Sequence, residues 1–528
     1  MSPRSRIVLL LLLFASHAVA QSSCPGGSGC PPQFNEKSKV YSRPSSTENV
    51  ATRRLRAGIQ EAESLLDGKD RAGASRILGR AMGDPGFGTL PAADRRLAWT
   101  VRARIDMAEG HYVRAIEYLQ KAIDAEDSDP DVWFWLAMNQ HHQGKHEAAA
   151  KSFTELAERW PELLVNVDPA DVYRLQAALR EGSREKMDFL QTLFDARWDD
   201  PTGDASVLWH HLALMRLDRG ENDLARAAIR RVVHPGVIIA MRSDKRFDAL
   251  VDRDAWAFHP GRASERAVEA MRGKVEARPD DLDARVQLSY AMLDAGDHEG
   301  VLRFVDASLA LSPKKDWSED ADVASVERSD KQAWLLNNRA VALYRLGRTQ
   351  EALADMERAR RLSDGEGPNV SQTLNLGEFH CMQGNAADAR RMADAVDGGQ
   401  ISDYGRMFQA RLRLCAAWLS KDANGMKRVL ATIRKARASS EWIHLDALVM
   451  LERYDEAAQA LIQLLDSPKE RSDTLSALQR YRQVPPTPAL SRVRLQHEAL
   501  LARDDVKAAI ERVGRRESYD LYPDAGFD

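Results

Sequence analysis

The sequence has few cysteines, few aromatic residues and no excess of charge of one sign. Four cysteines in 528 residues cannot form the framework of a disulfide-rich domain. The 75 Lys and Arg residues against 79 Asp and Glu residues leave a net charge of −4, which argues against nucleic-acid binding through a dominant basic field. Beyond the first twenty residues, no apolar run approaches the roughly 18 residues that span a bilayer. With 44% hydrophobic residues, the remaining chain is expected to fold and to be soluble.

Motifs of common enzymes and metal sites are also missing. The sequence has no Gly-rich phosphate loop, no His-Glu-x-x-His and no Gly-x-Ser-x-Gly. His142 and His146 have the spacing of two metal ligands on a helix, but Gly144 lies between them and no cysteine or carboxylate completes the set. The acidic run 124–131 lacks the glycine of an EF-hand loop and is expected to be a solvated loop. We therefore expect no catalytic residue, no cofactor and no metal.

The first twenty residues have the pattern of an export signal. Two arginines precede the apolar run 7–14, and the small residues Ala18 and Ala20 flank Val19, as a signal peptidase requires. Cleavage after Ala20 would leave a flexible leader, 21–48, rich in Ser, Pro and Gly. The usage of Ala, Arg, Asp and Gly resembles that of bacterial proteins from high-GC genomes. We expect a periplasmic or secreted protein.

Two cysteines lie in this leader and leave alternatives open. A lipid anchor at Cys24 is the rival to simple cleavage, but the residues before it lack the aliphatic side chain expected of a lipidated cysteine. In an oxidising compartment, Cys24 and Cys30 could close a small loop.

From about residue 49 the pattern becomes helical, with apolar residues at i, i+3, i+4 and i+7 broken by short turns. Gly110 and Gly144 are 34 residues apart, which is the period of a two-helix repeat. The turn glycines that align with one another are Gly110, Gly144, Gly220, Gly296, Gly347 and Gly384. Seven residues before them stand the small residues Ala103, Ala137, Ala213, Ser289, Ala340 and Gly377. Small side chains at this point let two helices cross closely.

These residues resemble the tetratricopeptide repeat, a 34-residue helix-turn-helix unit. The unit with the fullest match has Trp133, Leu136, Ala137, Gly144, Ala149, Phe153 and Pro161. Two further units match well around Gly220 and Gly347, weaker copies surround Gly110, Gly296 and Gly384, and degenerate helix pairs occupy 51–82, 170–197, 406–436 and 442–465. The resemblance implies an all-α, right-handed solenoid with a long concave surface lined by the first helix of each repeat.

The sequence divides the array at two interruptions. We expect an N-terminal array over 49–240, a junction at 241–262, and a C-terminal array over 263–515 that ends in a capping helix. A charged insert, 314–331, interrupts the second array, and an aromatic and acidic tail, 516–528, follows it.

The resemblance also predicts which side chains face the groove. In this family an Asn two positions before the small residue often binds a peptide backbone, and Asn338 and Asn375 stand there. Helical spacing adds Trp334, Asn337, Val341, Tyr344 and Arg345 to this face, and the same register in the N-terminal half adds Phe134, Trp135, Met138, His141, His142, His210 and His211. Amides, an arginine and aromatic anchors together suit an extended peptide. No Lys and Arg pair follows in the next repeat, so recognition of a C-terminal carboxylate is not expected.

Two classes of function fit this pattern. One is a non-enzymatic scaffold of the bacterial cell envelope that holds a protein or peptide in its groove. The other is an enzyme or small-molecule binder with a pocket at the junction, around Phe247, Trp256 and His259. A third arrangement, in which the tail from Tyr519 folds into the chain's own groove, would make the protein a self-inhibited or oligomerising binder.

Cys381 and Cys415 are also 34 residues apart, which places them at equivalent positions of neighbouring repeats. Neighbouring helices lie about 8–10 Å apart, while a disulfide needs Cα atoms within about 7 Å. We therefore expect two reduced, buried thiols.

Overall fold

A computed structural model describes residues 49–200, 203–311, 323–362, 369–396 and 401–522. Within this part the fold is all α-helical, with two isolated β-bridges and no strand. No helix in it is long and apolar enough to cross a membrane. The export signal, the leader with its two cysteines, and residues 523–528 of the tail lie outside the described residues.

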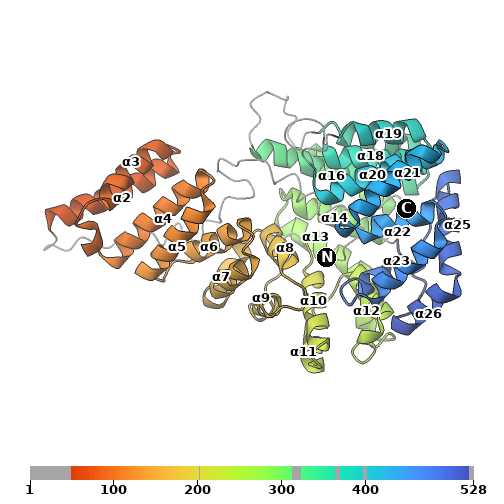
Figure 1. The fold of residues 1–528 in the computed structure, drawn as a ribbon, viewed down its shortest axis with the longest axis horizontal. Helices are drawn as coiled ribbons and strands as arrows, with labels where there is room; N and C mark the ends of the chain where they lie inside the picture. The colour runs from red at the N-terminus through yellow and green to blue at the C-terminus, as the bar shows by residue number, and fades with distance from the viewer. Residues whose placement is uncertain (1–48, 201–202, 312–322, 363–368, 397–400, 523–528) are drawn as a thin grey trace. The chain divides into compact units, whose positions relative to one another are not determined.

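The described residues form two compact units, 49–199 and 200–522 (Figure 1). The division precedes the expected boundary at residue 240, because the helices after 200 belong with the junction and the C-terminal array. The α-helices of the first unit are α2 (Val50–Asp67), α3 (Arg71–Met82), α4 (Ala92–Ala108), α5 (Tyr112–Ala125), α6 (Pro130–His142), α7 (His146–Arg159), α8 (Pro169–Ala178) and α9 (Arg184–Asp195). Short 3-10 turns, η2 (Phe87–Thr89) and η3 (Pro161–Asn166), accompany them.

The second unit continues the same pairing of antiparallel helices. Its α-helices are α10 (Ser206–Leu217), α11 (Asn222–Ile229), α12 (Pro235–Ser243), α13 (Pro260–Ala277), α14 (Leu282–Asp294), α15 (His298–Ala310), α16 (Val323–Arg345), α17 (Thr349–Ala359), α18 (Val370–Met382), α19 (Ala386–Asp394), α20 (Asp403–Leu419), α21 (Ala423–Lys435), α22 (Glu441–Met450), α23 (Tyr454–Asp466), α24 (Arg471–Ala477), α25 (Pro488–Leu501) and α26 (Asp504–Val513). Its 3-10 turns are η4 (Lys245–Phe247), η5 (Trp256–Phe258) and η6 (Arg437–Ser439).

The repeat that contains α6 and α7 shows how the sequence sets these boundaries. The Asp129 carboxylate accepts a hydrogen bond from the Asp131 amide and Pro130 occupies the first helical position, so α6 begins there. Of the acidic run 124–131, residues 126–129 form the predicted loop, while its two ends belong to α5 and α6. The Asp127 carboxylate in this loop accepts bonds of 2.7 Å from both Trp133 and Arg159. This loop therefore ties the start of one helix to the end of the other.

Left-handed residues make the turns between paired helices. All six aligned glycines have φ between +70° and +80°, and Gly182 joins them at +73°. In three other turns the same position is held by Lys69, Lys421 and Glu452, with φ of 67°, 56° and 57°. Each of these residues stands two positions before the second helix of its pair. The degenerate repeats thus keep the turn without the glycine that would reveal it in the sequence.

The small residues expected at the helix crossings are buried, and the A helices, meaning the first helices of the pairs, pack closely there. At Gly377 in α18, an added Cβ would lie only 2.8 Å from Leu412 Cδ1 of α20. This close approach explains why the expectation of reduced thiols at Cys381 and Cys415 is wrong. The two residues, one helical turn further along, form a disulfide with their Cα atoms 6.2 Å apart. The usual interaxial distance does not apply where a glycine lets two helices touch.

At the left-handed turns, we expect Gly384→Ala to lower the free energy of unfolding by roughly 1–2 kcal/mol. No atom lies within 4 Å of the added Cβ, so backbone strain is the sole cost. The reverse change, Lys421→Gly, should leave the stability equal or up to about 1 kcal/mol higher, because relief of strain opposes the greater freedom of the unfolded chain. Urea denaturation measures both. A Gly384→Ala variant as stable as the parent would show that this turn is not strained.

The disulfide has its own test. Peptide mapping without reductant should recover a species that joins the peptides of Cys381 and Cys415. Replacing both cysteines by serine should lower the free energy of unfolding by about 3–4 kcal/mol, because the bond closes a loop of 34 residues in the unfolded chain. Recovery of both cysteines as free thiols from protein purified under oxidising conditions would contradict the pairing.

Candidate functional site

The groove residues predicted on α16 and α18 are brought together, but they are buried. Asn338 Nδ2 donates to Ser289 Oγ of α14 at 2.7 Å, and Asn375 Nδ2 donates to Asn337 Oδ1 at 3.2 Å. Asn337 Nδ2 in turn donates to Asn338 Oδ1 at 3.3 Å. The amides therefore form a ladder across three A helices. The exposed fractions of the predicted side chains are 0% for Trp334 and Asn338, 2% for Asn337 and Tyr344, 5% for Asn375 and 7% for Arg345.

The ladder continues with charged groups beyond α18. Arg411 of α20 forms ion pairs with Glu378 of α18 and with Asp446 of α22, the latter at 3.0 Å. Burial alone would raise the pKa of Asp446, but Arg411 and His497 outweigh it and hold the pKa far below its usual value. Neighbouring A helices are thus joined by polar contacts that a sequence register cannot distinguish from ligand contacts. Peptide binding by the buried amides stays a prediction.

The chain's own C-terminal residues cover this face. Val484 and Tyr522 belong to the same apolar cluster as Trp334, Val341 and Tyr344. The Tyr344 hydroxyl donates to the Pro485 carbonyl at 3.2 Å. An extended stretch, 480–487, between α24 and α25 therefore occupies the position that a bound peptide was expected to take.

A second extended stretch, 515–522, follows α26 and lies beside the first. The Arg480 amide donates to the Glu517 carbonyl at 3.0 Å, and the Tyr519 amide donates to the Arg480 carbonyl at 2.8 Å. The Arg482 amide donates to the Leu521 carbonyl at 3.0 Å. The two bonds of Arg480 have the pattern of a parallel bridge between Arg480 and Ser518.

The last described residue, Tyr522, docks at the turn between α14 and α15. The centroid of its ring lies 4.2 Å from the guanidinium carbon of Arg345. The centroids of the Tyr522 and His298 rings are 4.8 Å apart. Gly296 in this turn differs from the other aligned glycines, because its Cβ position would be 3.0 Å from Arg482 Nη1 and 3.4 Å from Tyr522 Cε2. The absent side chain at Gly296 therefore makes room for the tail as well as for the turn.

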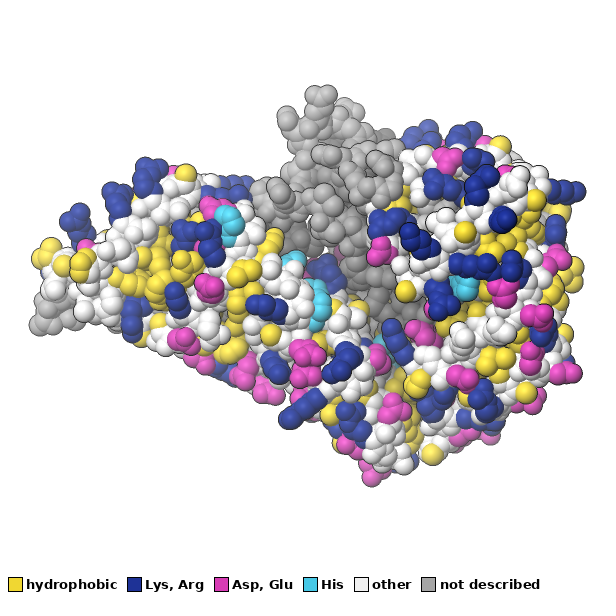
Figure 2. Space-filling view, viewed as in Figure 1, with side chains coloured by type: hydrophobic (Ala, Val, Ile, Leu, Met, Phe, Trp, Pro, Cys, Tyr) yellow, Lys and Arg dark blue, Asp and Glu magenta, His cyan; other side chains and the backbone are white. Residues whose placement is uncertain are grey.

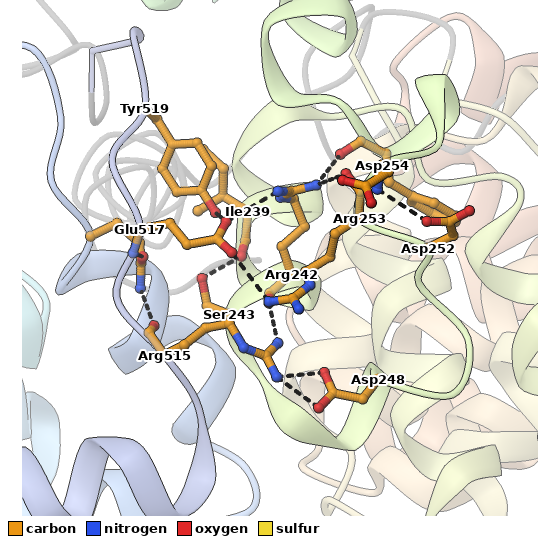
Figure 3. A network of polar contacts seen from close by, with 12 residues as sticks. Ile239, Arg242, Ser243, Asp248, Asp252, Arg253, Asp254, Arg515, Glu517 and Tyr519 are labelled. Atoms are coloured by element: carbon orange, nitrogen blue, oxygen red, sulfur yellow. Dashed lines mark hydrogen bonds and ion pairs between the residues drawn. The ribbon is translucent and has the colours of Figure 1, made fainter.

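The start of the tail is bound to the junction, as Figure 3 shows. The Arg515 amide donates to the Ser243 carbonyl at 3.0 Å, and both carboxylate oxygens of Asp248 accept bonds of 2.7 Å from its guanidinium. Arg242 pairs with the Glu517 carboxylate at 3.2 Å and Arg253 pairs with it at 3.4 Å. Two guanidinium groups therefore share one carboxylate.

The contacts at the junction shift the pKa values of two side chains of the tail, Glu517 and Tyr519. Burial alone would raise the pKa of Glu517, but the Tyr519 hydroxyl, Arg242 and Arg253 outweigh it and lower the pKa below its usual value. Burial and the bond that the Tyr519 hydroxyl donates to Glu517 raise the pKa of Tyr519 to about 12. The contact is thus a carboxylate held by two cations and one hydroxyl.

A buried ion pair connects the junction with the end of the array. Asp244, with no exposed surface, accepts bonds from Arg246 at 2.6 Å and from Ser472 of α24 at 2.7 Å. Its pKa, which burial alone would raise, is lowered by Arg246 and Ser472. The second unit is therefore closed, with the residues before α13 bound to those after α23. Within this closure, α12 packs against α24.

The three side chains expected to line a junction pocket do not share one. Phe247 is fully buried and stacks on His210, with ring centroids 5.4 Å apart. Trp256 is 64% exposed, under the Arg266 guanidinium. His259 accepts a hydrogen bond from the Arg262 amide at the start of α13. An open depression nearby is polar and is lined by Arg242, Asp248, Val251, Asp252, Arg253, Asp254 and Glu517.

The predicted groove residues of the first unit differ in exposure. Phe134 and Trp135 are buried, with the Arg104 guanidinium over the Trp135 ring at 5.6 Å. Met138 and His141 are half-buried, and His142 is exposed and stacks on Tyr112. In the second unit, His211 is half-buried beside the buried His210. Only part of the predicted N-terminal set is therefore open to a partner.

No convergent metal site is formed by these histidines. Nδ1 of His141 lies 3.2 Å from Nδ1 of His146, and burial, with His146, lowers the pKa of His141 to about 4. One further group that could hold an ion combines Asp106, Glu109 and His111, but Asp106 already pairs with Arg102 and Arg114.

Sequence reasoning missed the junction residues that hold the tail. Arg242, Ser243 and Arg253 lie in a stretch that breaks the repeat pattern, and their partners Arg515 and Glu517 follow more than 250 residues later. The tail's aromatic and acidic composition was the available signal, and it pointed to the right part of the chain.

Comparison with known proteins identifies the repeats. A family model, Tetratricopeptide repeat, matches residues 100–163 and 337–400. These two segments carry tetratricopeptide repeats. No curated protein matches it. The second match, in α16 to α19, includes Asn337, Asn338 and Asn375 of the amide ladder.

Several solved structures match the chain at low sequence identity and low TM-score. The yeast Tom70 structure is 10% identical, with 87% of this chain and 99% of that chain covered and a TM-score of 0.32. The P58(IPK) TPR domain is 16% identical, with 85% and 100% covered and a TM-score of 0.17. The Cut9-Hcn1 structure is 14% identical, with 87% and 96% covered and a TM-score of 0.23. Such likenesses say nothing of this chain's partners.

The tail's docking site predicts a pH effect through His298. Its side chain contacts Tyr522, and neither ring nitrogen has a hydrogen-bond partner among the described residues. Burial, Arg345 and Arg482 lower its pKa from 6.5 to about 4, with Asp297 opposing them. Because the unfolded chain then binds the proton first, His298 lowers the free energy of unfolding as the pH falls from 6.5 to 4.

We expect His298→Phe to remove this contribution while keeping a ring against Tyr522. Relative to the parent, the variant should gain about 2 kcal/mol in unfolding free energy between pH 7.5 and pH 4.5. Urea denaturation at the two pH values measures the difference. Equal pH dependence in the two proteins would show that His298 is protonated in the folded chain at pH 4.5.

Proposed function

We propose that this protein is an exported, non-enzymatic scaffold of the bacterial cell envelope that holds a protein partner on its repeats. The observation that carries this proposal is the array of tetratricopeptide repeats itself. Repeats of this kind present extended surfaces made of successive helices, and such surfaces suit protein segments. Within the described residues, the polar contacts that join neighbouring repeats include amide hydrogen bonds, such as that of Asn375, and ion pairs, such as those of Arg411.

The surface charge agrees with a protein partner. On the face that Figure 2 shows, basic and acidic side chains are interspersed over both units, with no extended patch of one sign. Nucleic-acid and membrane surfaces are bound through fields of basic charge, which this face lacks.

Two observations support export. The first twenty residues have the pattern of a signal peptide. The disulfide between Cys381 and Cys415 is a bond that forms and persists in oxidising compartments and is rare in the cytosol. Both fit a periplasmic or secreted protein.

The first unit offers an open part of the predicted groove face. Met138, His141 and His142 lie on α6 in the register that faces the concave side, and none of the three is buried. In the second unit, the chain's own C-terminal residues cover the corresponding face. Contacts with a partner are therefore expected first from α6.

The test is affinity capture from envelope extract with the mature chain from Gln21 as bait. We expect one protein to be retained, and expect the double change Met138→Ala and His142→Ala to reduce its retention at least five-fold, because both side chains lose surface that can be buried. The matched control changes Glu155 and Glu158 to Ala on the exposed side of α7.

Equal retention by the α6 variant and the parent would exclude this surface. Failure to retain any protein after chemical crosslinking would count against the scaffold itself. Circular dichroism of each variant establishes that the loss does not come from unfolding.

A further inference from the structure

Residues 517–522 contact the second unit in the way that a bound peptide would. They are extended, pair through their backbone with residues 480–482, and place one carboxylate and one aromatic ring at separate positions. We propose that this segment is an internal ligand, and that the partner docks an extended segment of the same chemistry in its place. That chemistry is a carboxylate followed five residues later by an aromatic ring. The inference rests on the proposed scaffold function and assigns it a second, regulated site.

The carboxylate position is built by the junction. Arg242 and Arg253 both pair with Glu517, at 3.2 and 3.4 Å. Arg242 is held in place at both ends. Its guanidinium also donates to the Arg253 carbonyl at 2.5 Å, and the Arg242 carbonyl accepts a bond of 2.7 Å from the Arg515 guanidinium. A guanidinium fixed in this way recognises a carboxylate more strongly than a flexible cation does, and Arg253, whose side chain is 46% exposed, adds a second positive charge. The position is open on one side, as part of the polar depression at the junction (Figure 3).

The aromatic position is built by the turn between α14 and α15. The Arg345 guanidinium lies over the Tyr522 ring, and its Nη1 donates to the Leu293 carbonyl at 3.1 Å, which fixes its direction. His298 closes the position at the ring's edge, and Gly296 leaves the space in which the ring sits. A cation over the face of a ring favours Tyr, Trp or Phe over an aliphatic side chain.

Between these positions, the backbone of Arg480 and Arg482 supplies bonds that do not depend on sequence. The Arg480 amide and carbonyl and the Arg482 amide all bond to the tail. An added strand gains affinity from such main-chain bonds and specificity from its side-chain positions. A partner segment can therefore replace the tail without any change in residues 480–482.

The tail can leave without unfolding a helix. The stretch 480–487 is fixed at both ends, between α24 and α25, whereas 517–522 follows α26 and is fixed at its start by Arg515. Part of the tail's contact is weak, because Asp520 and Arg482 form an ion pair that is largely exposed. The partner competes with the chain's own tail, whose effective concentration at the site is near the millimolar range. The tail therefore sets the affinity or concentration that a partner needs in order to bind.

The experiment uses the mature chain and a variant that ends at Arg516, which keeps the Arg515 contacts. The probe is a fluorescent peptide with the sequence of residues 517–528, and the measurement is fluorescence anisotropy. We expect the shortened chain to bind the peptide, and the full chain to bind it at least ten-fold more weakly because its own tail occupies the site.

Peptide variants distinguish binding through the carboxylate and aromatic positions from non-specific binding. Glu517→Gln together with Tyr522→Ala in the peptide should weaken binding to the shortened chain at least ten-fold. Asp520→Asn is the matched control and should weaken it less than three-fold, because that side chain is 82% exposed. Equal affinity of all three peptides would overturn the proposal, as would equal binding of the probe by the full and shortened chains.

A second variant covers the case in which the shortened chain does not fold. In the full chain, Glu517→Gln with Tyr522→Ala should increase hydrogen exchange at the Arg480 and Arg482 amides and should restore binding of the parent peptide. Absence of both effects overturns the proposal. A dimer of the full chain that dissociates on shortening would assign the site to a second copy of this chain, which also overturns it.

The outcome is distinguishable from failure of the scaffold function. If envelope protein is captured equally by full and shortened chains and the peptide binds neither, the internal ligand is wrong and the scaffold stands. If the peptide binds the shortened chain but no protein is captured by either, the scaffold fails and the partner's role in displacing the tail fails with it. Greater capture by the shortened chain supports both.

Discussion

Close packing between successive A helices is the constraint on which the rest of this structure depends. A single helix pair of this kind cannot bury its own apolar surface, so each pair must lie directly against the next. The buried small residues at the crossings, among them Ala340 and Gly377, set that distance. The amide ladder through Asn338, the ion pairs of Arg411 and the Cys381–Cys415 bond all form where the helices are already close.

Closure of the second unit follows from the same requirement. A repeat array has two ends, and each end leaves an apolar face without a neighbour. Here α24 packs against α12, and Asp244, Arg246 and Ser472 satisfy one another in the buried contact. The extended residues that line the inside of this closed unit then cover the face of α16 and α18. The unit thus caps itself and covers its own groove with two extended stretches of chain, 480–487 and 515–522.

Much of the fold could be predicted from the sequence because its signals are local. The helix pattern, the glycine turns and the small crossing residues each depend on a few neighbouring positions, and the structure has them in the expected places. The left-handed turns at Lys421 and Glu452 could not be predicted, because tertiary packing holds residues other than glycine at positive φ there. The disulfide could not be predicted from an average interhelix distance, because Gly377 makes this helix crossing unusually close.

The site was harder to predict, since it depends on contacts distant in sequence. Register placed Asn338, Asn375 and Tyr344 on one face, but it could not show whether that face is open. The pairing of Glu517 with Arg242 has no local signature at all, because each residue lies outside the repeats. Residues that interrupt a repeat pattern therefore merit as much attention as those that obey it.

Because the tail comes last in the sequence, its contact with the second unit is the last to form as the protein is made. Residues 517–522 follow every helix of the second unit that the structure describes, so a ribosome makes them after those helices. Until residues 517–522 have been made, they cannot cover the face of α16 and α18. A partner that is present while the protein is being made meets an empty site, whereas one that arrives later meets a competitor already in place.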